Sequence, residues 1–240
     1  MPIITIDDIK NAFYINLEHR TDRKVHVETE LLNIGVKAER FNAIKMENGA
    51  IGCSMSHLKL LQDAQKNKLD HILIVEDDIK FLNPELFKSQ INKFFEIHQN
   101  NWDVILLAGN NMPPYTNIDD TCIKVSRCQT TTGYIVNGHY IKVLLQNVKM
   151  GLTHLLNKPT EQSKYAIDKF WFVLQSASKW YLIIPPTVVQ REDYSDIEKK
   201  ITNYEKHMQD LDKTEMIDAI REMRYKHNIN TNLKKTAKFM

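Results

Sequence analysis

Short, uninterrupted apolar runs alternate along the chain with stretches in which apolar residues recur every three or four positions. Three of the runs have the length of strands, at 12–17, 71–75 and 103–107. Continuous apolar runs are typical of strands that are covered on both faces, and the stretches between them have the spacing of amphipathic helices. The pattern therefore predicts an α/β fold, with a mixed and mostly parallel sheet flanked by helices.

The predicted helices begin and end at recognisable residues. The expected N-terminal caps are Thr21 or Asp22 for the first helix, Ser54 for the second and Asn83, followed by Pro84 at the first helical position, for the third. Gly35 is expected to end the first helix, and the third should run to about His98. Further strands are expected within 37–44, 130–136 and 180–184, and further helices at 139–148 and from about 168, while 151–165 has little pattern.

The length fits one large domain followed by a tail. A chain of 240 residues with 42% hydrophobic content can bury the core of one α/β domain. From Ile197 onward the sequence predicts two charged amphipathic helices and a basic end. We therefore expect residues 1–197 to form the domain and residues 198–240 to form a C-terminal helical and basic tail.

The charge balance and the apolar runs exclude some partners. The chain has 32 basic and 30 acidic residues, so its formal net charge of +2 gives no global field that favours nucleic acid. Residues 1–8 lack the features of a secretory signal, and no apolar run approaches the ~20 residues that span a bilayer. We therefore expect a cytoplasmic protein with reduced cysteines. The basic segment 234–238 is expected to be a solvated end or, less favoured, a peripheral contact with an anionic membrane.

Three consecutive carboxylates, Glu76, Asp77 and Asp78, follow the buried run 71–75. Charges this close repel one another strongly where water is scarce, so a cation is expected beside them. Side chains alternate along a strand, which would turn Glu76 and Asp78 to one side and Asp77 to the other. Hard oxygen ligands at the carboxyl end of a strand suit Mn²⁺ or Mg²⁺ shared with the phosphates of a nucleotide-diphosphate donor. Capping of the next helix is the weaker alternative, because Asn83-Pro84 already starts that helix.

Other polar residues have a functional and a structural interpretation. Arg20 and Arg23 either bind a diphosphate or ribose, or lie on a surface turn. His57 has no partner at metal-ligand spacing, which favours a packed or hydrogen-bonded helix residue. In the segment 191–196, Asp196 is a further candidate metal ligand, and Ser195 is favoured as the cap of a helix at Ile197.

Three segments, 13–23, 49–57 and 72–79, together resemble glycosyltransferase family 25, which includes bacterial lipopolysaccharide galactosyltransferases and collagen galactosyltransferases. They occur in the order and at the spacing of that family. A weaker resemblance continues through 132–134, 167–168 and 195–197, so that it covers roughly residues 10 to 197.

The resemblance implies a GT-A-like fold, a UDP-sugar donor, dependence on Mn²⁺ and inversion at the anomeric carbon. The residues that it places at the donor are Asn16, Arg20, Arg23, Asp77, Thr132 and Gly133, and those expected to bind the metal are Glu76, Asp78 and Asp196. An inverting transfer needs a general base for the acceptor hydroxyl. Asp168 is the first candidate for that base, although an acid favoured by the start of a helix is an equal alternative.

The sequence thus predicts a metal-dependent inverting glycosyltransferase. It would move a hexose, galactose or glucose, from a UDP-sugar to a glycan, a lipid-linked sugar or a glycoprotein. One alternative is a non-catalytic module that binds a sugar nucleotide or a glycan. A second is a nucleotidyltransferase, against which the absence of a G-x-x-x-x-G-K-[ST] loop counts.

Overall fold

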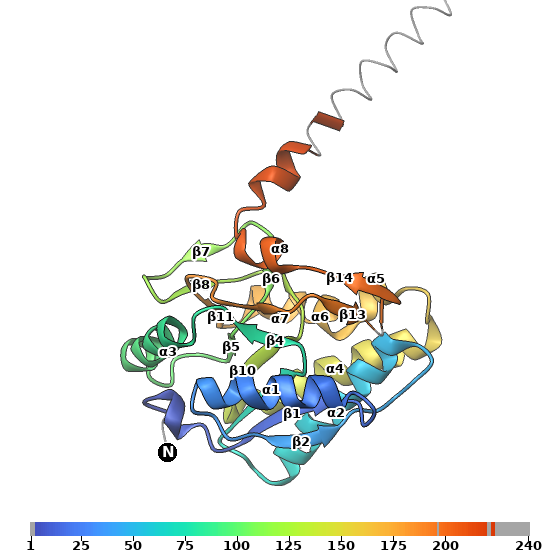
Figure 1. Ribbon diagram of the computed structural model, residues 1–240, viewed down its shortest axis with the longest axis horizontal. Helices are drawn as coiled ribbons and strands as arrows, with labels where there is room; N and C mark the ends of the chain where they lie inside the picture. The colour runs from blue at the N-terminus through green and yellow to red at the C-terminus, as the bar shows by residue number, and fades with distance from the viewer. Residues whose placement is uncertain (1–2, 196, 220–221, 224–240) are drawn as a thin grey trace, which may run out of the picture.

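A computed structural model of the chain describes residues 3–195, 197–219 and 222–223 (Figure 1). Within them, the main sheet has the strand order β2-β1-β3-β10-β5-β11-β8-β7. Its strands are β1 (Ala12–Asn16), β2 (Glu39–Asn42), β3 (His71–Glu76), β5 (Val104–Leu106), β7 (Thr116–Asn117), β8 (Cys122–Lys124), β10 (Gly133–Asn137) and β11 (Trp180–Ile183).

The strands of this sheet run mostly in one direction. β2, β1 and β3 are parallel neighbours, and β5 and β11 are another parallel pair. β10 lies between β3 and β5 and is antiparallel to both, and β8 is antiparallel to β11 and β7. The predicted mixed, mostly parallel α/β sheet is therefore confirmed.

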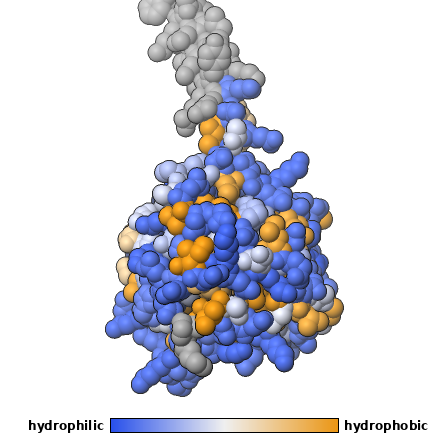
Figure 2. Space-filling model, turned by 90° about the vertical axis from the view of Figure 1, so that its left-hand side faces the viewer, coloured by the Kyte–Doolittle hydropathy of each residue, from blue (hydrophilic) through white to orange (hydrophobic). Residues whose placement is uncertain are grey.

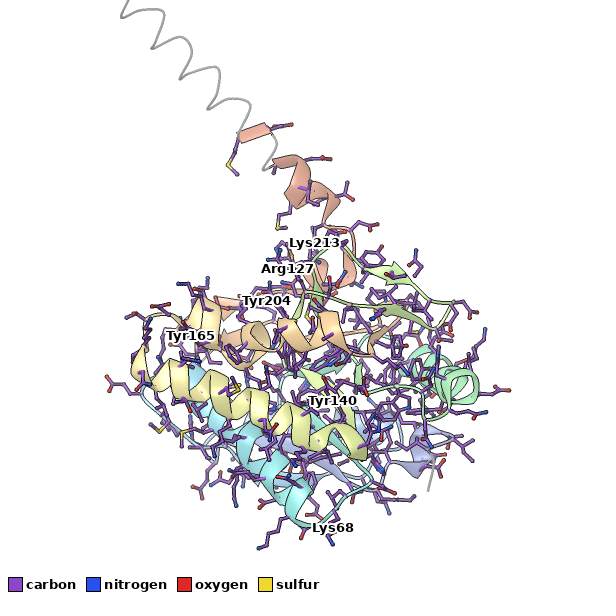
Figure 3. The ribbon with its side chains drawn as sticks, turned by 180° about the vertical axis from the view of Figure 1, so that it is seen from behind. Lys68, Arg127, Tyr140, Tyr165, Tyr204 and Lys213 are labelled. Atoms are coloured by element: carbon purple, nitrogen blue, oxygen red, sulfur yellow. The ribbon has the colours of Figure 1, made fainter. Side chains whose placement is uncertain are left out.

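Helices cover both faces of the sheet. They are α1 (Thr21–Asn33), α2 (Gly49–Lys66), α3 (Pro84–His98), α4 (Ile141–Asn157), α5 (Gln162–Tyr165), α6 (Ile167–Phe170), α7 (Phe172–Ala177) and α8 (Glu205–Gln209), with short 3₁₀ turns at Ile6–Asp8 and Gly138–Tyr140. Adjacent strand residues point to opposite faces, so Tyr14 packs in a core with α1 and α3, and Ile15 in a core with α2 and α4. In Figure 3, seen from behind, α4 and α2 lie on the near side of the sheet.

The starts of the helices follow local hydrogen bonding. α2 begins at Gly49, because the Asn48 side chain accepts from the backbone N–H groups of Ala50 and Ile51 at 3.0 and 3.3 Å. The predicted start at Ser54 is wrong, since its hydroxyl donates to the Ala50 carbonyl inside the helix. The caps predicted for the first helix are wrong as well, because α1 already includes Thr21. The start of α3 at Asn83-Pro84 is confirmed.

α4 continues nine residues beyond the predicted end at 148. Leu152 and Leu155 extend its buried face into the segment that seemed poorly patterned. Gly151 interrupts the apolar spacing for a packing reason: a Cβ there would come within 2.9 Å of the Phe170 ring. The missing side chain lets α6 approach α4 closely.

Three small two-stranded sheets complete the described part of the chain. They pair β4 (Ile79–Phe81) with β12 (Val188–Gln190), β6 (Asn110–Asn111) with β9 (Cys128–Gln129), and β13 (Asp193–Ser195) with β14 (Lys200–Thr202). The helix expected at Ile197 is wrong, because a turn at 197–199 joins β13 to β14 instead. This hairpin spans the expected domain boundary.

The segment after β14 packs on the domain. Met208 of α8 is buried in the hydrophobic core, and the buried Lys213 side chain donates to the backbone carbonyls of His207 and Asp210 (Figure 3). The predicted basic end at 234–238 lies outside the described residues. Across the described ranges, no helix has the length and apolar character needed to cross a membrane. The face that carries α3 is mostly hydrophilic, with separate apolar patches (Figure 2).

Candidate active site

A cleft of about 570 Å³ lies where β1 and β3 end. Ligands of open α/β sheets bind at the carboxyl ends of strands. Six predicted site residues line the cleft, namely Arg20, Arg23, Glu76, Asp77, Asp78 and Asp168. Asn16, Thr132 and Gly133 are buried next to residues that line it. Asp196 lies outside the described residues.

The three acids diverge at a tight turn between β3 and β4. Glu76 ends β3, and Asp77 and Asp78 form the turn into β4. The turn is held on both sides, because the Glu76 N–H donates to the Thr132 carbonyl at 2.9 Å and the Arg191 N–H donates to the Asp78 carbonyl at 2.8 Å. Each carboxylate therefore has its own surroundings.

Asp77 is hydrogen-bonded to two of the residues that are predicted to bind the sugar-nucleotide donor. Its Oδ2 accepts from Asn16 Nδ2 at 2.7 Å, and its Oδ1 accepts from Arg23 Nη1 at 2.9 Å. Burial raises the pKa of Asp77, although the neighbouring Arg23 charge and these hydrogen bonds lower it in part. With both oxygens engaged, Asp77 fixes Arg23 at the edge of the cleft.

Asp78 has an unsatisfied oxygen. Its Oδ2 lies 3.4 Å from Arg23 Nη1, but its Oδ1 is buried and has no hydrogen-bond partner among the described residues. Burial, followed by the charge of Glu76, raises the pKa of Asp78 to about 7. Asp78 lines the cleft, and a hard oxygen without a partner fits a divalent cation, whose charge would stabilise the ionised form.

Glu76 ends a chain of hydrogen bonds from the protein interior. Its Oε1 accepts from the Thr131 hydroxyl at 2.7 Å, from His57 Nε2 at 3.3 Å and from the Cys53 thiol at 3.5 Å. Because the Glu76 carboxylate accepts from Nε2, the other His57 nitrogen is free to accept from the Tyr134 hydroxyl, 2.7 Å away. Burial alone would raise the pKa of Glu76, but His57 and the other donors outweigh it and lower the pKa.

His57 itself has no exposed surface, so it is the packed, hydrogen-bonded helix residue that its sequence context favoured. Its partner Tyr134 could not be identified from the sequence, because the two residues meet only through the pairing of β10 with β3.

Asp168 also lines the cleft, from the first turn of α6. Its Oδ2 accepts from the Thr130 backbone N–H at 3.2 Å and lies 3.6 Å from Lys169 Nζ. Thr130 has a φ of 76°, in the left-handed region that a β-branched residue rarely adopts. The contact with Asp168 thus holds a strained backbone residue on the cleft wall.

Thr132 and Gly133 shape the site from behind. The Thr132 hydroxyl donates to the Thr130 hydroxyl at 3.3 Å. A Cβ at Gly133 would come within 2.9 Å of Ile79 Cδ1, so glycine lets β4 pack against β10. Neither side chain lines the cleft.

A carboxylate that the sequence did not single out joins the two predicted arginines. Asp193 Oδ2 accepts from Arg20 Nη2 at 2.9 Å and from Arg23 Nε at 3.0 Å, and it forms an ion pair with Arg191 Nη2, 2.9 Å away. Both Arg191 and Asp193 belong to the polar segment 191–196, but only the fold shows that it returns to the start of α1, about 170 residues away in sequence.

Within the part of the chain that the structure describes, two groups of side chains have ligand atoms close enough to share a metal ion. One is Cys53, His57 and Glu76 beside the cleft, and the other is His98, Asp119 and Cys122 at the end of α3. In the first group, Cys53 and His57 are already hydrogen-bonded to Glu76 Oε1. The second was not foreseen from the sequence.

Residues 45–171, more than half of the chain, match the model of glycosyltransferase family 25, described as an LPS biosynthesis protein. The chain therefore belongs to glycosyltransferase family 25, as its motifs predicted. A protein of Drosophila pseudoobscura pseudoobscura named as a glycosyltransferase 25 family member is 29% identical over an alignment that covers 32% of this chain and 16% of that relative.

Two solved structures are similar to the chain at low sequence identity. A structure titled mannose-1-phosphate geranyltransferase, from Thermus thermophilus, is 11% identical, with 72% of this chain and 73% of that chain covered and a TM-score of 0.44. A glycosyltransferase involved in the glycosylation of the major capsid of PBCV-1 is 14% identical, with 83% and 88% covered and a TM-score of 0.41. The GT-A-like form of the fold stays a prediction from the family resemblance.

Proposed function

We propose that the chain is a metal-dependent, inverting glycosyltransferase that transfers galactose or glucose from a UDP-sugar to a hydroxyl of a glycan, a lipid-linked sugar or a glycoprotein. The observation that supports this most directly is the unsatisfied, buried oxygen of Asp78, in a cleft that Arg20 and Arg23 also line. Membership of family 25 agrees with it.

Asp78 and Glu76 would hold the cation, either Mn²⁺ or Mg²⁺, with Asp196 as a further ligand. When bound, a divalent cation neutralises the negative charge that develops on the departing diphosphate. Asp77 would stay outside the coordination, since Asn16 and Arg23 occupy both of its oxygens.

Arg20 and Arg23 would bind the phosphate oxygens of the donor, because guanidinium groups match phosphate geometry. Arg23 is well suited, since Asp77 holds its Nη1 and its side chain is only 10% exposed. Because the Arg23 guanidinium is already held in place before the sugar nucleotide binds, less conformational entropy is lost on binding.

Asp168 would act as the general base. As the acceptor oxygen bonds to the anomeric carbon and the bond to the diphosphate breaks, the hydroxyl proton passes to the Asp168 carboxylate. The Thr130 N–H holds Oδ2 of this side chain, which directs the carboxylate from the far wall of the cleft.

Isothermal titration of UDP tests the metal requirement. We expect UDP to bind at least about tenfold more tightly with Mn²⁺ than with a chelator, because the cation links the acids to the diphosphate. Equal affinities would refute the proposed mechanism. Release of UDP from UDP-galactose or UDP-glucose then separates catalysis from binding alone.

A further inference from the structure

Three arginine side chains converge on one carboxylate oxygen at the cleft. Arg20, Arg23 and Arg191 all lie within 3.0 Å of Asp193 Oδ2. All three arginines line the cleft, and their side chains are 15%, 10% and 27% exposed. The convergence therefore belongs to a recessed wall rather than to an open surface.

Arg20 and Arg23 also have acceptors besides Asp193, because Arg20 donates to Asp22, and Arg23 donates to Asp77 and to the Tyr194 carbonyl. A guanidinium has several N–H donors in a fixed plane and no acceptor. The other oxygen of Asp193 accepts from the Tyr194 backbone N–H at 2.7 Å, so Oδ2 is the oxygen of Asp193 that the three arginines share. A diphosphate brings more oxygens and more negative charge, and it suits this arrangement better than a single carboxylate does.

The arginine residues have anchors outside the hairpin, and Arg20 is held by Asp22. Arg23 is fixed by Asp77, and the backbone of Arg191 is fixed by its hydrogen bond to the Asp78 carbonyl. Asp193, in contrast, begins the β13–β14 hairpin, which stands apart from the main sheet and in which Tyr194 and Ile201 are exposed. Ser195 and Thr202 of the same hairpin line the cleft.

We propose that Arg191 completes a three-arginine site for the donor diphosphate and that Asp193 occupies this site until the diphosphate displaces it. The inference rests on the proposed function, because it assumes a diphosphate ligand. Binding is then an exchange of one anion for another. The hairpin moves when Asp193 leaves, which alters the wall of the cleft at Ser195 and Thr202.

Titrations of UDP with two variants test the exchange, in the full chain and with Mn²⁺ present. In Asp193→Asn the competing charge is gone, so we expect UDP to bind about fivefold more tightly. In Arg191→Ala a phosphate donor is lost, so we expect binding about tenfold weaker. If Asp193 only aligned the arginines, the first variant would bind UDP more weakly, and the proposal would be overturned.

Matched controls separate this result from general effects. Asp63→Asn removes an exposed carboxylate that pairs with Lys59, and Arg127→Ala removes an arginine that stacks on Phe172. Both should bind UDP as the wild type does. An Arg191→Ala variant with unchanged affinity would also overturn the proposal.

The outcomes distinguish this proposal from the proposed function. If the wild type binds no UDP, the proposed function fails, and titration with pyrophosphate then decides the anion site alone. Weaker pyrophosphate binding in Arg191→Ala together with tighter binding in Asp193→Asn would support the anion site. The same affinity in both variants would overturn it. Hydrogen exchange at 193–195 and 200–202 should rise when the anion binds.

Discussion

Two aspartates, Asp119 at the end of α3 and Asp78 in the cleft, differ in how completely the fold satisfies their carboxylate oxygens. At the end of α3, Asp119 Oδ1 accepts from the Thr121 N–H and hydroxyl at 2.8 and 2.6 Å, and its Oδ2 accepts from His98 Nε2 at 2.8 Å. In the cleft, Asp78 Oδ1 has no such partner among the described residues. Nearness of ligand atoms alone therefore does not identify a site.

The pKa shifts of the two aspartates differ in sign for the same reason. Burial alone would raise the pKa of Asp119, but the hydrogen bonds from Thr121 and His98 outweigh it and lower the pKa. Burial and the charge of Glu76 raise the pKa of Asp78. The fold stabilises the anion at α3 and destabilises it in the cleft, which is the condition under which a cation is needed.

The largest expected effect is on catalysis in Asp78→Asn. We expect turnover of the UDP-sugar to fall by roughly 100-fold or more, because the charge that holds the cation is removed. The free energy of unfolding should not fall, since a neutral amide replaces a destabilised carboxylate. UDP release and urea denaturation measure the two quantities. Activity near the wild-type level would refute the role of Asp78.

Asp119→Ala should show the opposite pattern. The variant leaves two Thr121 donors and His98 without their acceptor, so we expect the free energy of unfolding to drop by about 2 kcal/mol. The turnover rate should change little, because Asp119 does not line the cleft. Urea denaturation and UDP release again give the result. A large loss of activity at normal stability would mean that the α3 group has a catalytic role.

The smallest effect is a difference in pH dependence. The folded pKa of Asp78, about 7, lies above the usual value of about 3.9 for an unfolded aspartate. Between these values the folded protein binds more protons than the unfolded chain, so the free energy of unfolding falls as pH rises. Without metal, the wild type should lose stability relative to Asp78→Asn between pH 5 and pH 7.

Asp119 provides the contrast in that experiment. Its lowered pKa stabilises the fold above the unfolded value of about 3.9, and this contribution is lost only as pH falls through the still lower folded pKa. The Asp119 carboxyl itself therefore adds no slope between pH 5 and pH 7, and any slope in the difference between Asp119→Ala and the wild type comes from His98, which loses its carboxylate partner. Parallel curves for Asp78→Asn and the wild type would contradict the raised pKa.

Local patterns in the sequence predicted most of the fold. The apolar runs at 12–17, 71–75 and 103–107 became β1, β3 and β5, because continuous burial on both faces leaves a clear signal. The direction of a strand leaves no such signal, because the apolar residues of β10 would be the same in a parallel and in an antiparallel strand. The helix starts were harder to predict, because each depends on the hydrogen bonds of a single capping side chain, such as Asn48, and other residues nearby could also form a cap.

The candidate site was predictable only where the motifs lie. The segments around Arg20, Glu76 and Asp168 are brought to one cleft, as their positions after strands or at a helix start would allow. The hairpin after 193 could not be predicted, because its charged residues suit a helix equally well, and its pairing with Arg20 and Arg23 is purely tertiary. When two segments far apart in the chain form a contact, the sequence of neither segment indicates it.

The pairing of β4 with β12 also determines how much of the chain must be synthesised before the cleft can assemble. The acidic turn lies between β3 and β4, and β4 pairs with a strand made about 100 residues later. A nascent chain that has not yet released Gln190 and Arg191 from the ribosome lacks both the pairing strand and the amide that holds the turn. Premature termination before this point would therefore yield a fragment that contains Glu76, Asp77 and Asp78 but has no assembled cleft.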